Sequence, residues 1–141
     1  MRRRLPGLNQ AAQKPQIADG IYLVRVQRAQ YQWQRQKPFY AIQFSVIEPK
    51  HLAGRSISGQ IYCTKKALWK LSWFLHDFGY DSELLERDEL EESSLVGLKG
   101  VIKISHTTVN GASVANLDSF APASRWPDLF SSRDRSEVAQ R

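Results

Sequence analysis

The side chains that most often perform catalysis or bind metals are scattered along this chain of 141 residues. His51, His76 and His106 each stand alone, and no C-x-x-C or H-x-x-x-H pattern supplies convergent metal ligands. Cys63 is the single cysteine, and its place at the end of an expected strand favours a small core residue over a nucleophile. The sequence also has no P-loop and no G-x-G-x-x-G motif. We therefore expect no enzyme, no metal site and no cofactor.

Aromatic and cationic side chains alternate in one stretch that has no apolar face. Every second position there carries a ring or a cation, namely Tyr31, Trp33, Arg35 and Lys37. Recognition of a single-stranded nucleic acid needs cations that follow the phosphates and flat rings on which bases stack. The stretch therefore predicts contact with such a strand. Two competing interpretations of Trp33 stay open, a ring that folds back on the core and a ring that contacts a protein partner.

The net charge of +6 is unevenly distributed. Residues 1–37 hold eight basic side chains and one acidic side chain, whereas residues 81–92 hold seven acidic and one basic. A basic front half suits an anionic partner. Nothing in the sequence pairs the carboxylates of 81–92 in a pocket, so we interpret that segment as a solvated face. Arg2, Arg3 and Arg4 are either a nonspecific electrostatic arm or an inert terminus.

Alternating apolar residues predict three strands before the centre of the chain. The first begins at Gly20, the second runs over 39–48 and the third over 55–63, with Gly59 indicating a bulge or bend. Residues 29–38 between the first two are either an exposed hairpin extension or a loop. The apolar residues expected to face inward on these strands are Tyr22, Val24, Val26, Tyr40, Ile42, Phe44, Val46, Ile57 and Ile61.

One strong helix is expected over 64–79. Thr64 suits the N-cap, and Gly79 suits a left-handed C-cap conformation. The predicted buried stripe contains apolar residues at spacings of three and four, which are Leu68, Leu71, Leu75 and Phe78, widened by Ala67 and Phe74. Trp69 and Trp73 are expected at the rim of the core. The lysines of the same helix are expected on a solvated face, with phosphate contact as the lesser interpretation.

Two further strands are expected after the acidic segment, around 100–108 and 112–119, joined at Asn110-Gly111. That dipeptide is a strong signal for a type I′ hairpin turn. The element order β-β-β-α-β-β is that of the OB-fold, a five-stranded Greek-key barrel in an all-β class with one helix. An open five-stranded sheet with the helix across one face is the alternative. We divide the chain into a flexible basic arm (1–18), the OB-fold domain (19–122) and a mostly disordered tail (123–141), in which Trp126, Leu129 and Phe130 are able to dock locally.

The OB-fold places its binding face on strands two and three, flanked by the loops that join strands one to two and four to five. In this sequence the second of these loops is Thr107 to Asn110. The predicted nucleic-acid-binding residues at the remaining positions are Arg25, Arg28, Tyr31, Trp33, Arg35, Lys37, Phe39, Arg55 and Tyr62.

Several short segments in order resemble a family of small phage- and prophage-type proteins, described broadly as a domain of unknown function. The segments are G-I-Y-L-V-R-V at 20–26, F-x-V-I-E-P at 44–49, A-G-R at 53–55, T-K-K-A-L-W-K-L-S-W-F-L at 64–75, L-V-G-L-K-G-V-I-K-I at 95–104, the N-G hairpin and F-A-P at 120–122. Members of that family are regarded as OB-fold proteins similar to single-stranded-DNA-binding proteins, so the resemblance implies this fold and this kind of binding. The basic arm before Gly20 and the mixed tail after Pro122 fall outside the resemblance. Dedicated replication proteins often end in an acidic tail, whereas the last residues here are not acidic.

Together these observations predict a non-catalytic protein that binds single-stranded nucleic acid during replication, recombination or transfer of a mobile element. DNA is the expected partner, and RNA stays open. Replication or recombination proteins are expected partners, and homo-oligomerisation stays open. The alternative is an accessory module that docks on a protein through exposed aromatic residues and the acidic segment. No apolar run approaches the roughly 18 residues that span a bilayer, so we expect no membrane contact and a cytoplasmic location.

Overall fold

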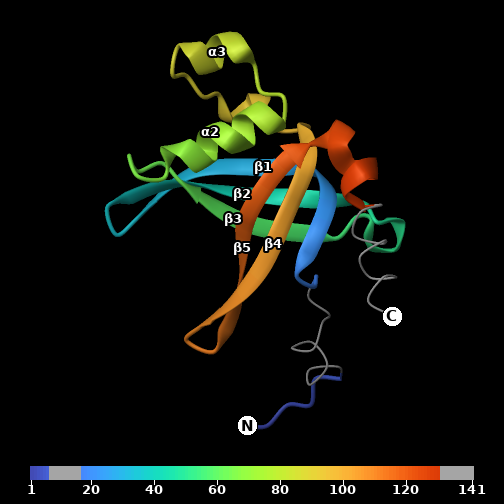
Figure 1. Cartoon of the computed structure of the whole chain (residues 1–141). Coiled ribbons are helices and arrows are strands. Elements are labelled where there is room, and N and C mark those ends of the chain that lie inside the picture. The colour runs from blue at the N-terminus through green and yellow to red at the C-terminus, as the bar shows by residue number, and fades with distance from the viewer. Residues whose placement is uncertain (7–16, 131–141) are drawn as a thin grey trace.

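The computed structural model describes residues 1–6 and 17–130, and it is built mainly from β-strands (Figure 1). Five strands form one antiparallel sheet: β1 (Gly20–Gln34), β2 (Lys37–Glu48), β3 (Ser56–Tyr62), β4 (Lys99–Val109) and β5 (Ala112–Pro122). Two short α-helices, α2 (Leu68–Asp77) and α3 (Ser82–Glu86), lie between β3 and β4. There are also three 3₁₀ turns, η1 (Lys50–Leu52), η2 (Glu92–Ser94) and η3 (Ala123–Arg125), and residues 126–130 are α-helical.

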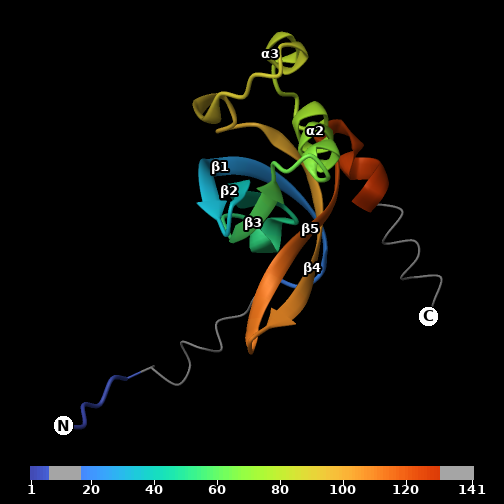
Figure 2. The same cartoon turned by 90° about the vertical axis from the view of Figure 1, so that its left-hand side faces the viewer.

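The strand order in the sheet is β3-β2-β1-β4-β5, so β3 and β5 are its two edges. The sheet curls strongly, as the quarter turn between Figures 1 and 2 shows, and its edges approach each other. The side chain of Leu117 in β5 packs against the backbone of Gly59 in β3. A Cβ placed on Gly59 would lie 2.7 Å from Leu117 Cγ. Within the described residues no hydrogen-bonded ladder joins β3 to β5, so the predicted barrel is not closed.

The expected hairpin extension of β1 and β2 is present, and its turn is made by two residues with positive φ. Arg35 and Gln36 have φ values of 51° and 65°, which fits the tight turns that connect twisted strands. A β-bulge interrupts the pairing between Val26 and Arg28, so Gln27 is an extra residue. The predicted Asn110-Gly111 hairpin is also confirmed, with φ values of 52° and 80°.

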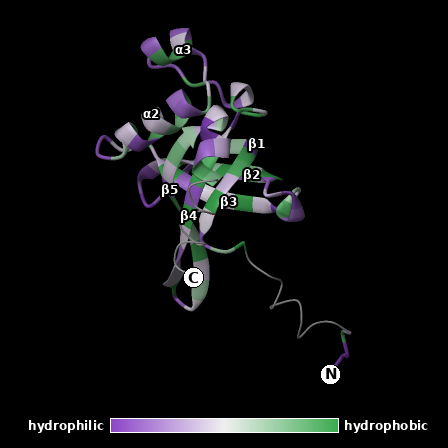
Figure 3. Cartoon of the chain, turned by 45° about the vertical axis from the view of Figure 1, so that its right-hand side comes forward, coloured by the Kyte–Doolittle hydropathy of each residue, from purple (hydrophilic) through white to green (hydrophobic). Residues whose placement is uncertain are grey.

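The core lies inside the curl of the sheet and is closed at one end by α2. Leu71, Phe74 and Leu75 of α2 are buried, and the Phe74 and Phe78 rings pack against each other with centroids 4.6 Å apart. Both rings also contact Phe44 of β2 and Phe120 of β5. Figure 3 shows the hydrophobic colour concentrated along the strands. This aromatic contact holds the helix across the end of the sheet.

The helix is shorter than predicted, and two residues of the predicted stripe, Ala67 and Leu68, are not buried. Hydrogen bonds from the amides of Ala67 and Leu68 to Thr64 O form a turn before α2, and no side chain caps the helix start. Gly79 has the expected left-handed conformation, and the amides of Gly79 and Tyr80 close a Schellman motif on His76 O and Leu75 O. Leu68 is 45% exposed, because the regular helix begins only there and this first turn extends past the packed surface.

The two helix tryptophans have different environments. Trp73 is partly buried, donates from Nε1 to Asp77 Oδ2 at 2.8 Å and packs edge-on against Phe120. Trp69 stacks on Trp73 and is 63% exposed, so the expected position at the core rim is right for Trp73 and wrong for Trp69. Trp69 is the second residue of α2, one turn before Trp73.

The packed part of the chain extends past both predicted boundaries. Ile17 belongs to the core, although it falls in the expected arm, and Trp126 is buried beyond the expected domain end at 122. The docking expected of Trp126 is therefore present, with the Phe130 ring 5.2 Å from it. The remaining parts of the expected arm and tail, residues 7–16 and 131–141, lie outside the described residues.

Of the two alternatives predicted for Gly59, a bulge or a bend, the bulge is absent. Gly59 pairs with Ile42 in an unbroken register between β2 and β3, and the lack of a side chain makes room for Leu117. We predict that Gly59→Ala lowers the free energy of unfolding by about 1–3 kcal/mol, because overpacking displaces Leu117. Denaturant unfolding monitored by circular dichroism measures this change.

The matched control is Ser58→Ala at the adjacent exposed position, which we expect to change stability little. In a double-mutant cycle, Leu117→Ala removes the colliding atoms, so Gly59→Ala should cost less in that background. Equal costs of Gly59→Ala in both backgrounds would contradict the packing described for this contact.

Candidate nucleic-acid interface

The register of β1, β2 and β3 places polar side chains in rows on the outer face of the sheet. Residues opposite each other in adjacent antiparallel strands share a face. One row consists of Arg28, Gln43 and Ser58, and the next consists of Gln30, Ala41 and Gln60. These rows lie across three strands and face away from the core. The outer face is therefore rich in amide and hydroxyl groups.

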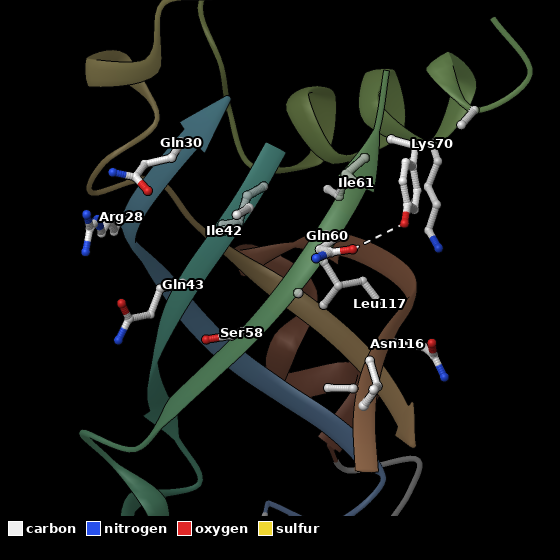
Figure 4. Close-up of a pocket in the computed structure, with 16 residues that line it drawn as sticks. Arg28, Gln30, Ile42, Gln43, Ser58, Gln60, Ile61, Lys70, Asn116 and Leu117 are labelled. Carbon is white, nitrogen blue, oxygen red and sulfur yellow. Dashed lines mark hydrogen bonds between the residues drawn. The ribbon is translucent and has the colours of Figure 1, made fainter. Parts of the chain in front are cut away.

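A groove of about 670 Å³ crosses β3 on this face (Figure 4). Arg28, Gln30 and Gln43 line it on the side of β1 and β2. Lys70 of α2 and Asn116 of β5 line it on the opposite side. Figure 4 shows these side chains on either side of β3, with Gln60 between them. The groove exists because the curl of the sheet brings β5 beside β3.

The charge of the groove has one sign. Its charged lining residues are Arg28 and Lys70, and no carboxylate is among the residues that line it. The Tyr62 ring lies at the groove and is 37% exposed, and its hydroxyl donates to Gln60 Oε1 at 3.3 Å. Two cations, several amides and one accessible ring are groups that bind phosphates, hydrogen-bond to base edges and stack on bases.

The structure brings together only some of the predicted site residues. Arg28 and Tyr62 line the groove. Arg25 is exposed and pairs with Ser45, one row beyond Arg28 on the same strand. Lys37 begins β2 and is exposed. Arg55 precedes β3 and is half-buried, so it lies outside the strand to which it was assigned.

Phe39 requires a correction, because it was expected to be an outward-facing ring. Its side chain is only 3% exposed, and the Tyr62 ring lies 5.7 Å from it between centroids. Phe39 pairs with Tyr62 in the register of β2 and β3. A ring covered in this way offers no free face to a base. Phe39 instead supports the more accessible Tyr62.

Tyr31 and Trp33 lie on the opposite face of the hairpin from the groove. Tyr31 pairs with Tyr40, a core residue, and their ring centroids are 5.3 Å apart. Trp33 packs edge-on against Tyr31 at 6.1 Å. The extra residue at Gln27 causes this placement, because a one-residue shift moves every following side chain to the other face. Arg35 forms the turn at the hairpin tip. The expected set therefore divides into two surfaces.

Sequence reasoning missed the contributions of α2 and β5 to the groove. Lys70 was expected mainly on a solvated face, with phosphate contact as the lesser interpretation. The loop between β4 and β5 was expected to flank the site, and no residue within β5 was. Asn116 lies in β5 and lines the groove. Only the proximity of β3 and β5 brings these residues to one place, and no periodicity in the sequence encodes that proximity.

The acidic segment 81–92 contacts the other surface and contributes no lining residue to the groove. Glu92 Oε1 accepts a hydrogen bond from the backbone amide of Tyr31 at 3.1 Å. Burial raises the pKa of Tyr40 to about 12, and Cys63 and then Glu92 add to the effect. The segment expected to be only a solvated face is therefore attached to the β1–β2 hairpin. It does not block the groove.

The remaining reactive side chains lie on separate elements of the described residues. Cys63 packs against the core, and burial raises the pKa of its thiol. His76 is exposed on α2, and His106 Nδ1 lies 2.5 Å from Asp19 Oδ1. Within residues 1–6 and 17–130, no three His, Cys, Asp or Glu side chains gather in a way that could hold a metal ion.

No protein-family model matches this chain. No curated protein matches it either. Across the described ranges, none of the helices combines the length and the apolar character needed to cross a bilayer.

Proposed function

We propose that this protein binds single-stranded nucleic acid, DNA in preference to RNA, in the groove that crosses β3. The observation that carries the proposal is a groove lined by two cations, four amide side chains and an accessible tyrosine, without a carboxylate. Such a lining suits a flexible polyanion with exposed bases. We assign the protein no catalytic step.

Each part of the groove has a separate role in this proposal. Arg28 and Lys70 on opposite sides neutralise successive phosphates and release their counterions. Tyr62 stacks on a base, and its bond to Gln60 orients the ring. Gln30, Gln43 and Asn116 present donors and acceptors to base edges and sugars. Affinity is therefore mainly electrostatic and tolerates many base sequences.

We further propose that the curled sheet is a partly open OB-type barrel. Three points support this assignment: the order of three strands, helices and two strands, the pairing of β1 with both β2 and β4, and α2 across one end of the sheet. A groove over β2 and β3 is where OB-folds bind oligonucleotides. The resemblance to phage-type proteins extends the proposal to replication, recombination or transfer of a mobile element.

Binding should weaken with salt, and Lys70 should account for part of the effect. We predict that an oligothymidylate of about 15 nucleotides binds at low salt and loses affinity between about 50 and about 200 mM salt. Lys70→Gln should reduce the slope of log affinity against log salt by about 0.7, the value for one phosphate contact on a single strand. Fluorescence anisotropy with a labelled oligonucleotide measures both quantities.

Lys50→Gln is the matched control, because Lys50 is exposed in η1 and does not line the groove. It makes the same change in net charge and should leave the slope nearly unchanged. If no binding is detected at low salt, the proposed function is wrong. If both variants change the slope equally, binding is electrostatic but does not use this groove.

Tyr62 should contribute through its ring and not through its hydroxyl. We predict that Tyr62→Ala weakens oligonucleotide binding by about 1–3 kcal/mol, the usual value of one base stacked on an aromatic side chain. Tyr62→Phe keeps the ring and should bind almost as well as the unchanged protein. Thermal unfolding of both variants shows whether the loss of the ring also affects Phe39 beneath it. Wild-type affinity in a folded Tyr62→Ala variant would exclude stacking at this position.

A further inference from the structure

The C-terminal half of β1 has an edge that pairs with no other strand among the described residues. β4 pairs with β1 only from Gly20 to Arg25, and Val26 then exchanges hydrogen bonds with Gly97 and Leu98. Beyond this point, residues 27–34 pair with β2 on one side only. Among the described residues, the one hydrogen bond made to the other side is that from the amide of Tyr31 to Glu92. Backbone donors and acceptors are therefore available along this edge.

Two aromatic rings accompany this edge and remain accessible. Tyr31 is 41% exposed and Trp33 is 65% exposed, although each contacts the other. The Tyr40 ring packs against the Tyr31 ring, and this contact holds Tyr31 and the adjoining Trp33 in place on the hairpin. Exposed rings next to an unpaired strand edge offer both apolar contact and backbone pairing to a second chain.

The C-terminal end of the acidic segment is positioned against the same edge by hydrogen bonds. The Tyr80 hydroxyl donates to Glu89 O at 3.1 Å and accepts from the amide of Glu91 at 2.9 Å. These bonds fix the chain just before Glu92, whose carboxylate reaches Tyr31. Seven acidic side chains and one basic side chain lie in residues 81–92. The segment that reaches this edge through Glu92 is therefore opposite in charge to the groove.

We infer that the edge of β1 at residues 27–34 is a docking site for an extended, basic segment of a partner protein. The segment adds to the sheet as a strand, and its backbone replaces Glu92 as the acceptor for the Tyr31 amide. Its apolar side chains pack on Tyr31 and Trp33, and its cations face residues 81–92. The acidic charge disfavours a nucleic acid here, and in the unbound protein Glu92 covers part of the edge.

A synthetic peptide tests this site independently of nucleic-acid binding. The probe is a fluorescent peptide of about eight residues that alternates Lys and Val, long enough for one strand. We predict saturable binding to the full chain by anisotropy, weakened about tenfold by Trp33→Ser, the change expected for loss of an aromatic anchor. Oligonucleotide affinity should not change in Trp33→Ser, because that residue lies outside the groove.

Trp69→Ser is the matched control, since Trp69 is an equally exposed tryptophan on α2, and it should keep full peptide affinity. The charge reversal Glu86→Lys with Glu89→Lys should also weaken peptide binding, and it alters no residue of the hairpin. A Lys-Val peptide with an N-methyl group on every residue has no backbone N–H on either edge, so it should bind poorly if the peptide adds to the sheet as a strand.

The inference is overturned if the Lys-Val peptide does not bind, if the N-methylated peptide binds equally well, or if Trp33→Ser and Trp69→Ser have equal effects. It is also overturned if sedimentation shows that a second copy of this chain occupies the edge and excludes the peptide. Failure of the oligonucleotide to bind would leave the peptide result intact, so the two proposals fail separately.

Discussion

The contact between Gly59 in β3 and Leu117 in β5 is the constraint on which the proposed binding surface depends. The lack of a side chain at Gly59 lets Leu117 pack directly over the strand, and this brings the two edges of the sheet together. The aromatic contacts of Phe74 and Phe78 with Phe120 hold β5 from the other end. Without this curl, Lys70 and Asn116 would not lie across β3 from Arg28, and the groove would be a flat sheet face.

The structure separates two surfaces of opposite charge. The groove carries cations on the outer face of the sheet, whereas the acidic segment contacts the free edge of β1 on the other side of the hairpin. This separation explains how a chain with a net charge of +6 accommodates a segment with seven carboxylates. In the two proposals above, a polyanion in the groove and a basic partner at the edge of β1 would occupy different surfaces of the hairpin.

Much of the fold could be predicted from the sequence, because its signals are local. Alternation defined the inward faces of β1, β2 and β3, and Asn110-Gly111 defined a turn. The face of Tyr31 and Trp33 could not be predicted, because it depends on the single extra residue at Gln27 and residues 27–34 have no apolar alternation. The burial of Phe39 and the role of Lys70 depend on contacts between distant elements, which no local pattern records.

The most direct test of the central claim is a map of amide chemical shifts in isotope-labelled protein during titration with oligothymidylate at low salt. The proposed groove predicts the largest changes at Gln43, Gln60 and Asn116, on three different strands, with small changes at Trp33. Changes confined to the β1–β2 hairpin, or none along β3, would contradict a binding surface built by the approach of β5 to β3.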